Sequence, residues 1–78
     1  MDVDPPTYTV RLIGVGPRRL EVMKALRAER PDLSLAEAQA LIDSAPQVVL
    51  DAVGHWDRET VLRRLERSGG RFELHRNE

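Results

Sequence analysis

The stretch YTVRLIGVGP, residues 8–17, decides how the chain begins to fold. Residues 8–12 alternate apolar and polar side chains and Ile13 follows them, which is the pattern of a strand with one buried face. Gly14 and Gly16 then predict a turn, and Pro17 suits the first position of a helix because its missing N–H costs nothing there. The stretch therefore predicts a strand, a glycine turn and a helix in direct succession.

Two helices are predicted after this turn. The first runs over residues 17–29, because Pro31 pushes the residue before it out of the helical region. The second begins at a capping box formed by Ser34 and Glu37, in which each side chain bonds the other residue's backbone N–H. Pro46 ends this helix. Its apolar positions recur at helical spacing and are expected to face inward; they are Leu35, Ala38, Leu41, Ile42 and Ala45.

The rest of the chain predicts a strand, a helix and a final strand. The short apolar run at residues 48–50, which includes two β-branched valines, starts a strand that ends near Gly54. Asp57 is expected to cap a third helix, with Trp56 packed against Val61 as a hydrophobic staple. The buried side of this helix comprises Val61, Leu62 and Leu65.

Two glycines, residues 69–70, end the third helix, since glycine adopts the positive φ of a helix C-terminus. Residues 71–75 then alternate as a last strand, with Phe72 and Leu74 toward the core. The element order is β-α-α-β-α-β. It predicts an α+β two-layer fold, in which a three-stranded antiparallel sheet is covered on one face by three helices.

The composition fits one small domain of 78 residues, with 41% hydrophobic and 32% charged side chains. We expect residues 1–7 to form a disordered N-terminal lead, residues 8–76 the domain, and residues 77–78 a tail. The chain has no cysteine, which excludes disulfides and thiolate metal sites. It also has no signal peptide and no apolar run long enough to span a bilayer, so we expect a cytoplasmic protein.

Charge is unevenly distributed along the chain. Residues 11–30 carry six basic groups against two acids, whereas residues 31–60 carry six acids against Arg58. Such asymmetry either steers an oppositely charged partner or forms two solvated surfaces, and the charges alone leave both open. The formal net charge of −1 argues against direct nucleic-acid binding.

Two short motifs invite a catalytic or ligand-binding interpretation. The glycines at residues 14–16 precede a helix, but no Lys-Ser/Thr pair follows, so we interpret them as a turn and not as a phosphate loop. Asp51, His55 and Asp57 are types that perform acid–base catalysis or bind metal. No side chain at helical spacing supplies a third metal ligand, and no candidate nucleophile lies beside these residues. The sequence therefore predicts no enzyme, no metal site and no cofactor.

One face of the first helix is left unexplained by core packing. Val22, Ala25 and Leu26 share one side, while a second set of apolar and cationic residues gathers on another. This second set is Leu20, Met23, Lys24 and Arg27, with Arg19 beside Met23. Protein-binding surfaces often combine adaptable apolar groups with arginine. Alternatively, the second helix partly covers Leu20 and Met23, and the cations only solubilise the surface.

Several segments together resemble one known family. They are YTVRL at residues 8–12, LEVMKALR at 20–27, LSLAEA at 33–38, LIDSAP at 41–46, Leu65-Glu66, the Gly69 turn and FEL at 72–74. Over about residues 8–75 the chain resembles the C-terminal domain of the bacterial large-subunit ribosomal stalk protein seven/twelve.

The resemblance implies a non-catalytic module in which the first two helices bind translational GTPases such as elongation factors Tu and G. The positions that fall on this surface are Arg19, Leu20, Met23, Lys24, Arg27 and Gln39. Gln39 and Ala36 replace lysines of the family, and Asp32 and Ser34 stand where glycines are expected. The resemblance implies a partner that is a GTPase or another acidic protein surface. We expect the chain to act as a monomer and to bind neither nucleic acid nor a membrane.

Only seven residues precede Tyr8, so we expect the chain to lack the family's dimerisation and ribosome-anchoring region. A weaker resemblance, to the substrate-delivery adaptor of the Clp protease, gives an alternative function. That adaptor carries acidic residues after its first strand to hold an N-terminal amine. The turn at residues 14–17 has none.

Overall fold

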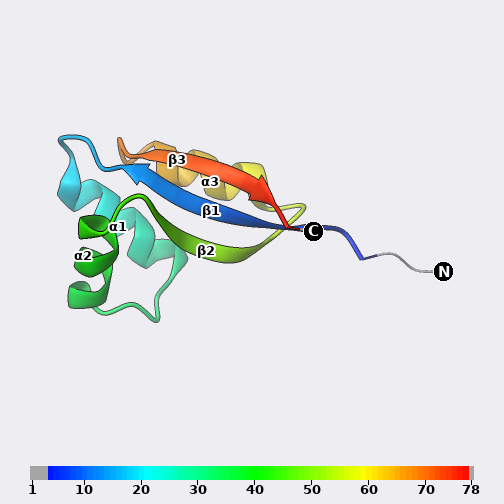
Figure 1. The fold of residues 1–78 in the computed structure, drawn as a ribbon, viewed down its shortest axis with the longest axis horizontal. Helices are drawn as coiled ribbons and strands as arrows, with labels where there is room; N and C mark the ends of the chain where they lie inside the picture. Colours follow the sequence, from blue (N-terminus) through cyan, green and yellow to red (C-terminus); the bar gives the residue numbers. More distant parts are fainter. Residues whose placement is uncertain (1–3, 78) are drawn as a thin grey trace.

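Six elements follow one another in the predicted order in the computed structural model, which describes residues 4–77 (Figure 1). The elements are β1 (Thr7–Gly14), α1 (Arg19–Glu29), α2 (Leu35–Asp43), β2 (Gln47–Gly54), α3 (Arg58–Glu66) and β3 (Arg71–Arg76). The α+β class is confirmed. Residues 1–3 of the predicted lead and residue 78 of the predicted tail lie outside the described residues.

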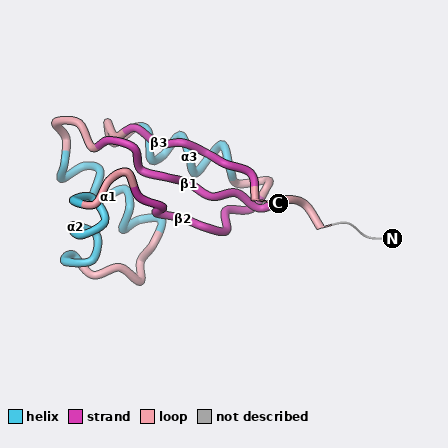
Figure 2. Tube along the Cα trace, in the orientation of Figure 1, coloured by secondary structure: helices cyan, strands magenta, loops and turns pink. Residues whose placement is uncertain are grey.

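The three strands form one antiparallel sheet in the order β2-β1-β3, with β1 at its centre (Figure 2). β1 buries Val10 and Leu12 completely. β2 pairs with β1 irregularly, because β2 has one extra residue between Val53 and Leu50 and another at Val49. Such bulges bend a strand and increase its twist. β2 and β3 are the two edges of the sheet.

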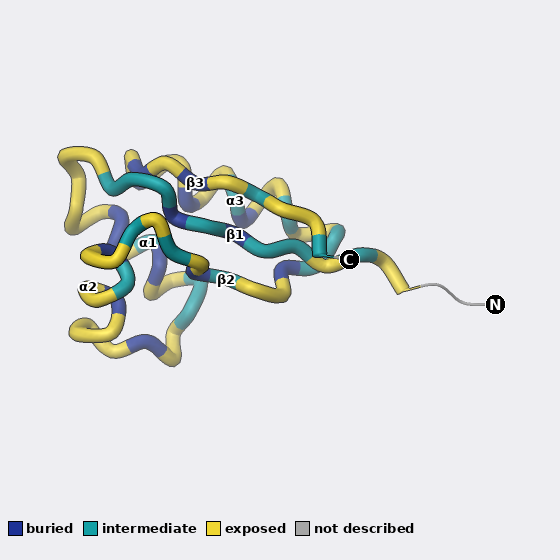
Figure 3. The backbone as a smooth tube through the Cα atoms, in the orientation of Figure 1, coloured by how far each residue is buried: buried dark blue, intermediate teal, exposed yellow. Residues whose placement is uncertain are grey.

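α1 lies between the other two helices and contacts both, while α3 packs on β3 and β2. The buried residues form a single core, which receives side chains from every element (Figure 3). They are Val10, Leu12, Val22, Met23, Leu26, Leu33, Ala38, Ile42, Val49, Val53, Val61, Leu65 and Phe72. No helix within residues 4–77 is long and apolar enough to cross a membrane.

α1 begins at Arg19, two residues later than the sequence predicts. Gly16 has a φ of 69°, and a Cβ at that position would lie 3.2 Å from the Gly69 carbonyl oxygen. Gly69 has a φ of 96° and would in turn press on the Arg18 side chain. The two glycine turns therefore pack against each other, and this contact keeps residues 16–18 out of the helix.

Two predicted core contacts are wrong. Leu35, at the first position of α2, is 55% exposed, and Leu33 from the preceding loop is buried in the core. Trp56 is 82% exposed and makes no staple; its ring meets the His55 ring edge to face, with centroids 4.9 Å apart. Asp57 occupies the position before α3, but its side chain accepts no capping hydrogen bond.

The predicted capping box is confirmed at the start of α2. The Ser34 hydroxyl accepts from the Glu37 N–H at 3.1 Å, and the Glu37 carboxylate accepts from the Ser34 N–H at 3.0 Å. This backbone N–H stabilises the charged carboxylate and lowers the pKa of Glu37 below its ordinary value of 4.5.

Asn77, which follows β3, ties the three strands together. Its backbone N–H donates to the Thr7 carbonyl oxygen at 2.9 Å. Its side-chain amide donates to the Thr7 hydroxyl and to the Asp51 carbonyl oxygen on β2, both at 3.1 Å, and accepts from the Thr9 hydroxyl at 2.6 Å. One side chain thus joins the end of β3 to β1 and to the bulged part of β2.

We predict that Asn77→Ala lowers the free energy of unfolding by about 1 kcal/mol, because several hydrogen bonds between strands are lost from a partly exposed site. Denaturant titration of Asn77→Ala, Thr9→Val and the double variant measures this. The two effects should be less than additive, since both substitutions delete the Thr9–Asn77 hydrogen bond. Full additivity would contradict the proposed bridge.

We predict that Glu37→Gln destabilises the protein at about pH 7 and that the loss shrinks toward about pH 3. The folded-state pKa of Glu37 is lowered, so its contribution is present above 4.5 and disappears as pH falls through the folded value. Thermal unfolding of wild type and variant across this range tests the sign. Glu66→Gln, at an exposed position outside the capping box, serves as the control.

Candidate functional site

The α1–α2 hairpin carries the surface that the sequence left unexplained. The two helices run antiparallel, and a polar contact fixes each end. Arg19 at the start of α1 forms an ion pair with Asp43 at the end of α2. At the other end, Arg27 Nε donates to the Leu33 carbonyl oxygen at 3.3 Å. The hairpin therefore presents a fixed outer face.

Three of the predicted α1 residues form one exposed stripe. Leu20, Lys24 and Arg27 recur at the spacing of a single helical face, and all are exposed. The Leu20 side chain is 59% exposed, which is unusual for so large an apolar group placed between cations. An apolar side chain flanked by flexible cations is a feature of protein-binding surfaces.

Met23 is not exposed on this surface. The sequence placed it on the same face as Leu20, but its exposure is only 8% and it joins the core with Val22 and Leu26. The reason is that α1 packs against both α2 and α3. Two neighbouring helices bury a wider part of its circumference than a single neighbour would. Met23 falls within that wider part.

α2 adds an uncharged strip to the hairpin surface. Gln39 is exposed, as are Ala36 and Ala40 beside it. Leu35, at the start of the same helix, is the residue that sequence reasoning missed, because its helical spacing matched the core. The available signal was the position of Leu35 in the first turn of α2, directly after the cap Ser34. Leu33, just before the cap, fills the core at this end of the helix, and Leu35 stays exposed.

The charges on the hairpin are only partly neutralised. Arg19 is paired with Asp43, and Lys24 Nζ lies 3.8 Å from Glu21 across an exposed helical turn, a separation at which attraction is weak. Within residues 4–77, Arg27 has no carboxylate partner. Asp32, in the loop between the helices, is bonded to Arg30 at 3.0 Å, and that hydrogen bond lowers the pKa of Asp32.

The other motifs do not assemble into a catalytic site. The His55 Nδ1 and the Tyr8 hydroxyl lie 3.2 Å apart in a hydrogen bond, and Arg58 lies over the Tyr8 ring. Asp51 and Asp57 instead line a hollow beside β2. No group of three or more histidine and carboxylate side chains in the described part of the chain is placed to hold a metal ion.

Comparison with known proteins gives one consistent result. Residues 8–75 match the family model described as the ribosomal protein L7/L12 C-terminal domain. The large ribosomal subunit protein bL12 of Caulobacter vibrioides is 34% identical over 86% of this chain and 53% of its own length. The bL12 proteins of Bifidobacterium animalis and Dechloromonas aromatica are 43% and 39% identical, again over 86% of this chain. The chain spans about half the length of these relatives.

The burial difference between Met23 and Leu20 gives a direct prediction. Met23→Ala should lower the free energy of unfolding by about 2–3 kcal/mol, because it leaves a cavity in the core. Leu20→Ala should change it by less than about 0.5 kcal/mol, as expected at an exposed position. Urea titration of both variants measures the contrast. Equal losses would show that Leu20 also packs into the core.

Proposed function

Since the chain belongs to the ribosomal protein L7/L12 C-terminal domain family, we propose that it is a non-catalytic module that binds translational GTPases through its α1–α2 hairpin. The binding residues in this proposal are Arg19, Leu20, Lys24, Arg27 and Gln39, with Leu35 added from the structure. The module acts as a monomer in the cytosol, where translation factors are found.

The observation that carries the proposal is the exposed stripe of Leu20, Lys24 and Arg27 on α1. Burying the exposed part of a leucine contributes about 25 cal/mol per Å² of apolar surface removed from water. Lys24 and Arg27 flank it, so a partner with an apolar pocket rimmed by carboxylates would satisfy both kinds of group. Leu35, which is exposed at the start of α2, supplies a second apolar contact.

Met23 supports this surface from inside the core. It is buried and adjoins the α1 stripe along the helix, so its substitution should change stability before it changes binding. Gln39 offers an amide where the family has a lysine, which removes one positive charge from the α2 side. The α1 cations therefore contribute more of the attraction to an acidic partner here.

The Clp-adaptor alternative gains no support from the turn after β1. That function needs carboxylates there to hold an N-terminal amine, whereas residues 15–18 carry none and end in Arg18. Arg18 packs against Gly69. A cation in this position opposes an amine.

We predict that elongation factors Tu and G shift the backbone amide signals of residues 19–27 of labelled protein, and that Lys24→Glu weakens binding about tenfold or more. Loss of a charged contact costs about 1–3 kcal/mol, and repulsion by the new carboxylate adds to it. Nuclear magnetic resonance titration of wild type and variant measures the change. The proposal fails for these factors if no signal moves at high micromolar factor.

Arg76→Glu is the matched control. It makes the same change of charge at an exposed position at the end of β3, next to Tyr8 and away from the hairpin. Binding should be unchanged in this variant. An equal loss in both variants would show that net charge, and not the α1 stripe, sets the affinity.

A further inference from the structure

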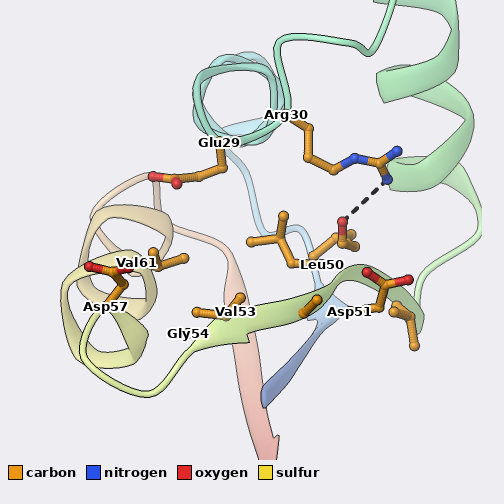
Figure 4. A pocket seen from close by; sticks show the side chains of 11 residues that line it. Glu29, Arg30, Leu50, Asp51, Val53, Gly54, Asp57 and Val61 are labelled. Carbon is orange, nitrogen blue, oxygen red and sulfur yellow. Dashed lines mark hydrogen bonds between the residues drawn. The ribbon is translucent and has the colours of Figure 1, made fainter. Parts of the chain in front are cut away.

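β2 is an edge strand with a hollow of about 500 Å³ beside it. The hollow follows the strand from Val48 to Gly54 and is closed by the end of α1 and the start of α3. Figure 4 shows Glu29 and Arg30 above the strand, Asp57 and Val61 to one side, and Leu50 on β2 between them. This site shares no residue with the hairpin stripe.

The floor of the hollow is apolar and its rim is acidic. Leu50, Val53 and Val61 contribute apolar side chains, of which Leu50 is only partly buried. Glu29 and Arg30 are both paired, with Arg64 at 2.8 Å and Asp32 at 3.0 Å. Within the described range, Asp51 and Asp57 have no ion-pair partner, and both are exposed. The uncompensated charge of the hollow is therefore negative.

An exposed aromatic side chain lies in the turn that adjoins the hollow. The Asp57 N–H donates to the Gly54 carbonyl oxygen at 3.1 Å, which closes the turn that connects β2 to α3. Gly54 and Asp57 line the hollow, and Trp56 lies in the turn between them, 82% exposed and edge-to-face with His55. A tryptophan ring attracts cations through its π face.

These observations favour a basic partner segment over a second copy of the chain. An antiparallel β2–β2 pairing centred near Asp51 would place two Asp51 carboxylates close together across the new interface, which is unfavourable. Lysine or arginine side chains would instead meet Asp51 and Asp57. Within residues 4–77, β1 pairs with one edge of β2, and no strand pairs with the other edge.

We propose that β2 binds an extended, basic segment of a partner protein by strand addition. The segment pairs with the free edge of β2, places an apolar side chain over Leu50, Val53 and Val61, and directs cations to Asp51 and Asp57. The Val49 carbonyl oxygen now accepts from Arg30 Nη1 at 3.3 Å and becomes available to a backbone N–H of the segment. Seven residues from Val48 to Gly54 correspond to at most about 20 Å of strand, because two bulges bend this segment.

A blocked peptide of about seven residues that alternates lysine and valine matches this length and tests the proposal. Trp56 is the only tryptophan of the chain, so its fluorescence reports binding without a label. We expect saturable change of this signal together with amide shifts confined to residues 48–57. No response at millimolar peptide, or shifts centred on α1 and α2, would overturn the proposal.

Two variants and two peptides separate the contributions. Asp51→Asn combined with Asp57→Asn should weaken binding about tenfold, since two exposed charge pairs together are worth about 1–2 kcal/mol; asparagine also suits the position before α3, so the fold is kept. Glu66→Gln, outside the hollow, should change nothing. A glutamate–valine peptide and a lysine–valine peptide with alternate amides methylated should both fail to bind. Equal binding by either one contradicts the charge or the strand pairing.

The outcome is independent of the proposed GTPase function. Lys24→Glu should leave the affinity for the lysine–valine peptide unchanged, because Lys24 does not line the hollow. If the β2 amides shift with protein concentration alone and the molecular mass doubles, the edge is an interface between copies. That result overturns the proposal of a basic partner.

Discussion

The burial of Val10 and Leu12 in the central strand is the constraint on which the rest of the structure depends. β1 is the strand that pairs with both neighbours, and its two inward side chains are completely buried. Val22 and Leu26 of α1 reach the same core with no exposed surface. Once these four residues meet, the turn between β1 and α1 must be short, and it closes with Gly16 packed against Gly69.

The position of α1 follows from this contact and determines what the surface offers. α1 touches the core on one side and has α2 and α3 on its flanks, so its outer face remains for solvent. That outer face contains Leu20, Lys24 and Arg27. The helix that holds the core together is therefore also the helix that carries the exposed stripe, and we expect a change on its inner face, such as at Met23, to act first on stability and then on the shape of the stripe.

The sequence was sufficient where one local interaction dominates. The capping box at Ser34, the glycine turn at Gly69 and the order of the elements were all predictable, because each depends on neighbouring residues. Leu35 and Trp56 were misplaced and the burial of Met23 was left open, since their burial depends on contacts that local spacing does not reveal. Helical spacing alone does not reveal that α1 has two flanking helices or that Leu33 closes the core before α2. Likewise, the bulges of β2 depend on its register with β1 and have no mark in the sequence of β2 itself.

The separation of charge along the chain becomes a separation in space. The basic segment contributes the α1 stripe, whereas the acidic segment contributes Asp51 and Asp57 beside β2. If both groups faced one another they would neutralise, as Arg19 and Asp43 do where the helices meet. Instead Arg27 on one surface and Asp51 on the other have no ionic partner within residues 4–77. Fields of opposite sign at two separate places attract groups of opposite charge. A net charge of −1 therefore describes a molecule with one cationic and one anionic surface region, and not one with evenly mixed charge.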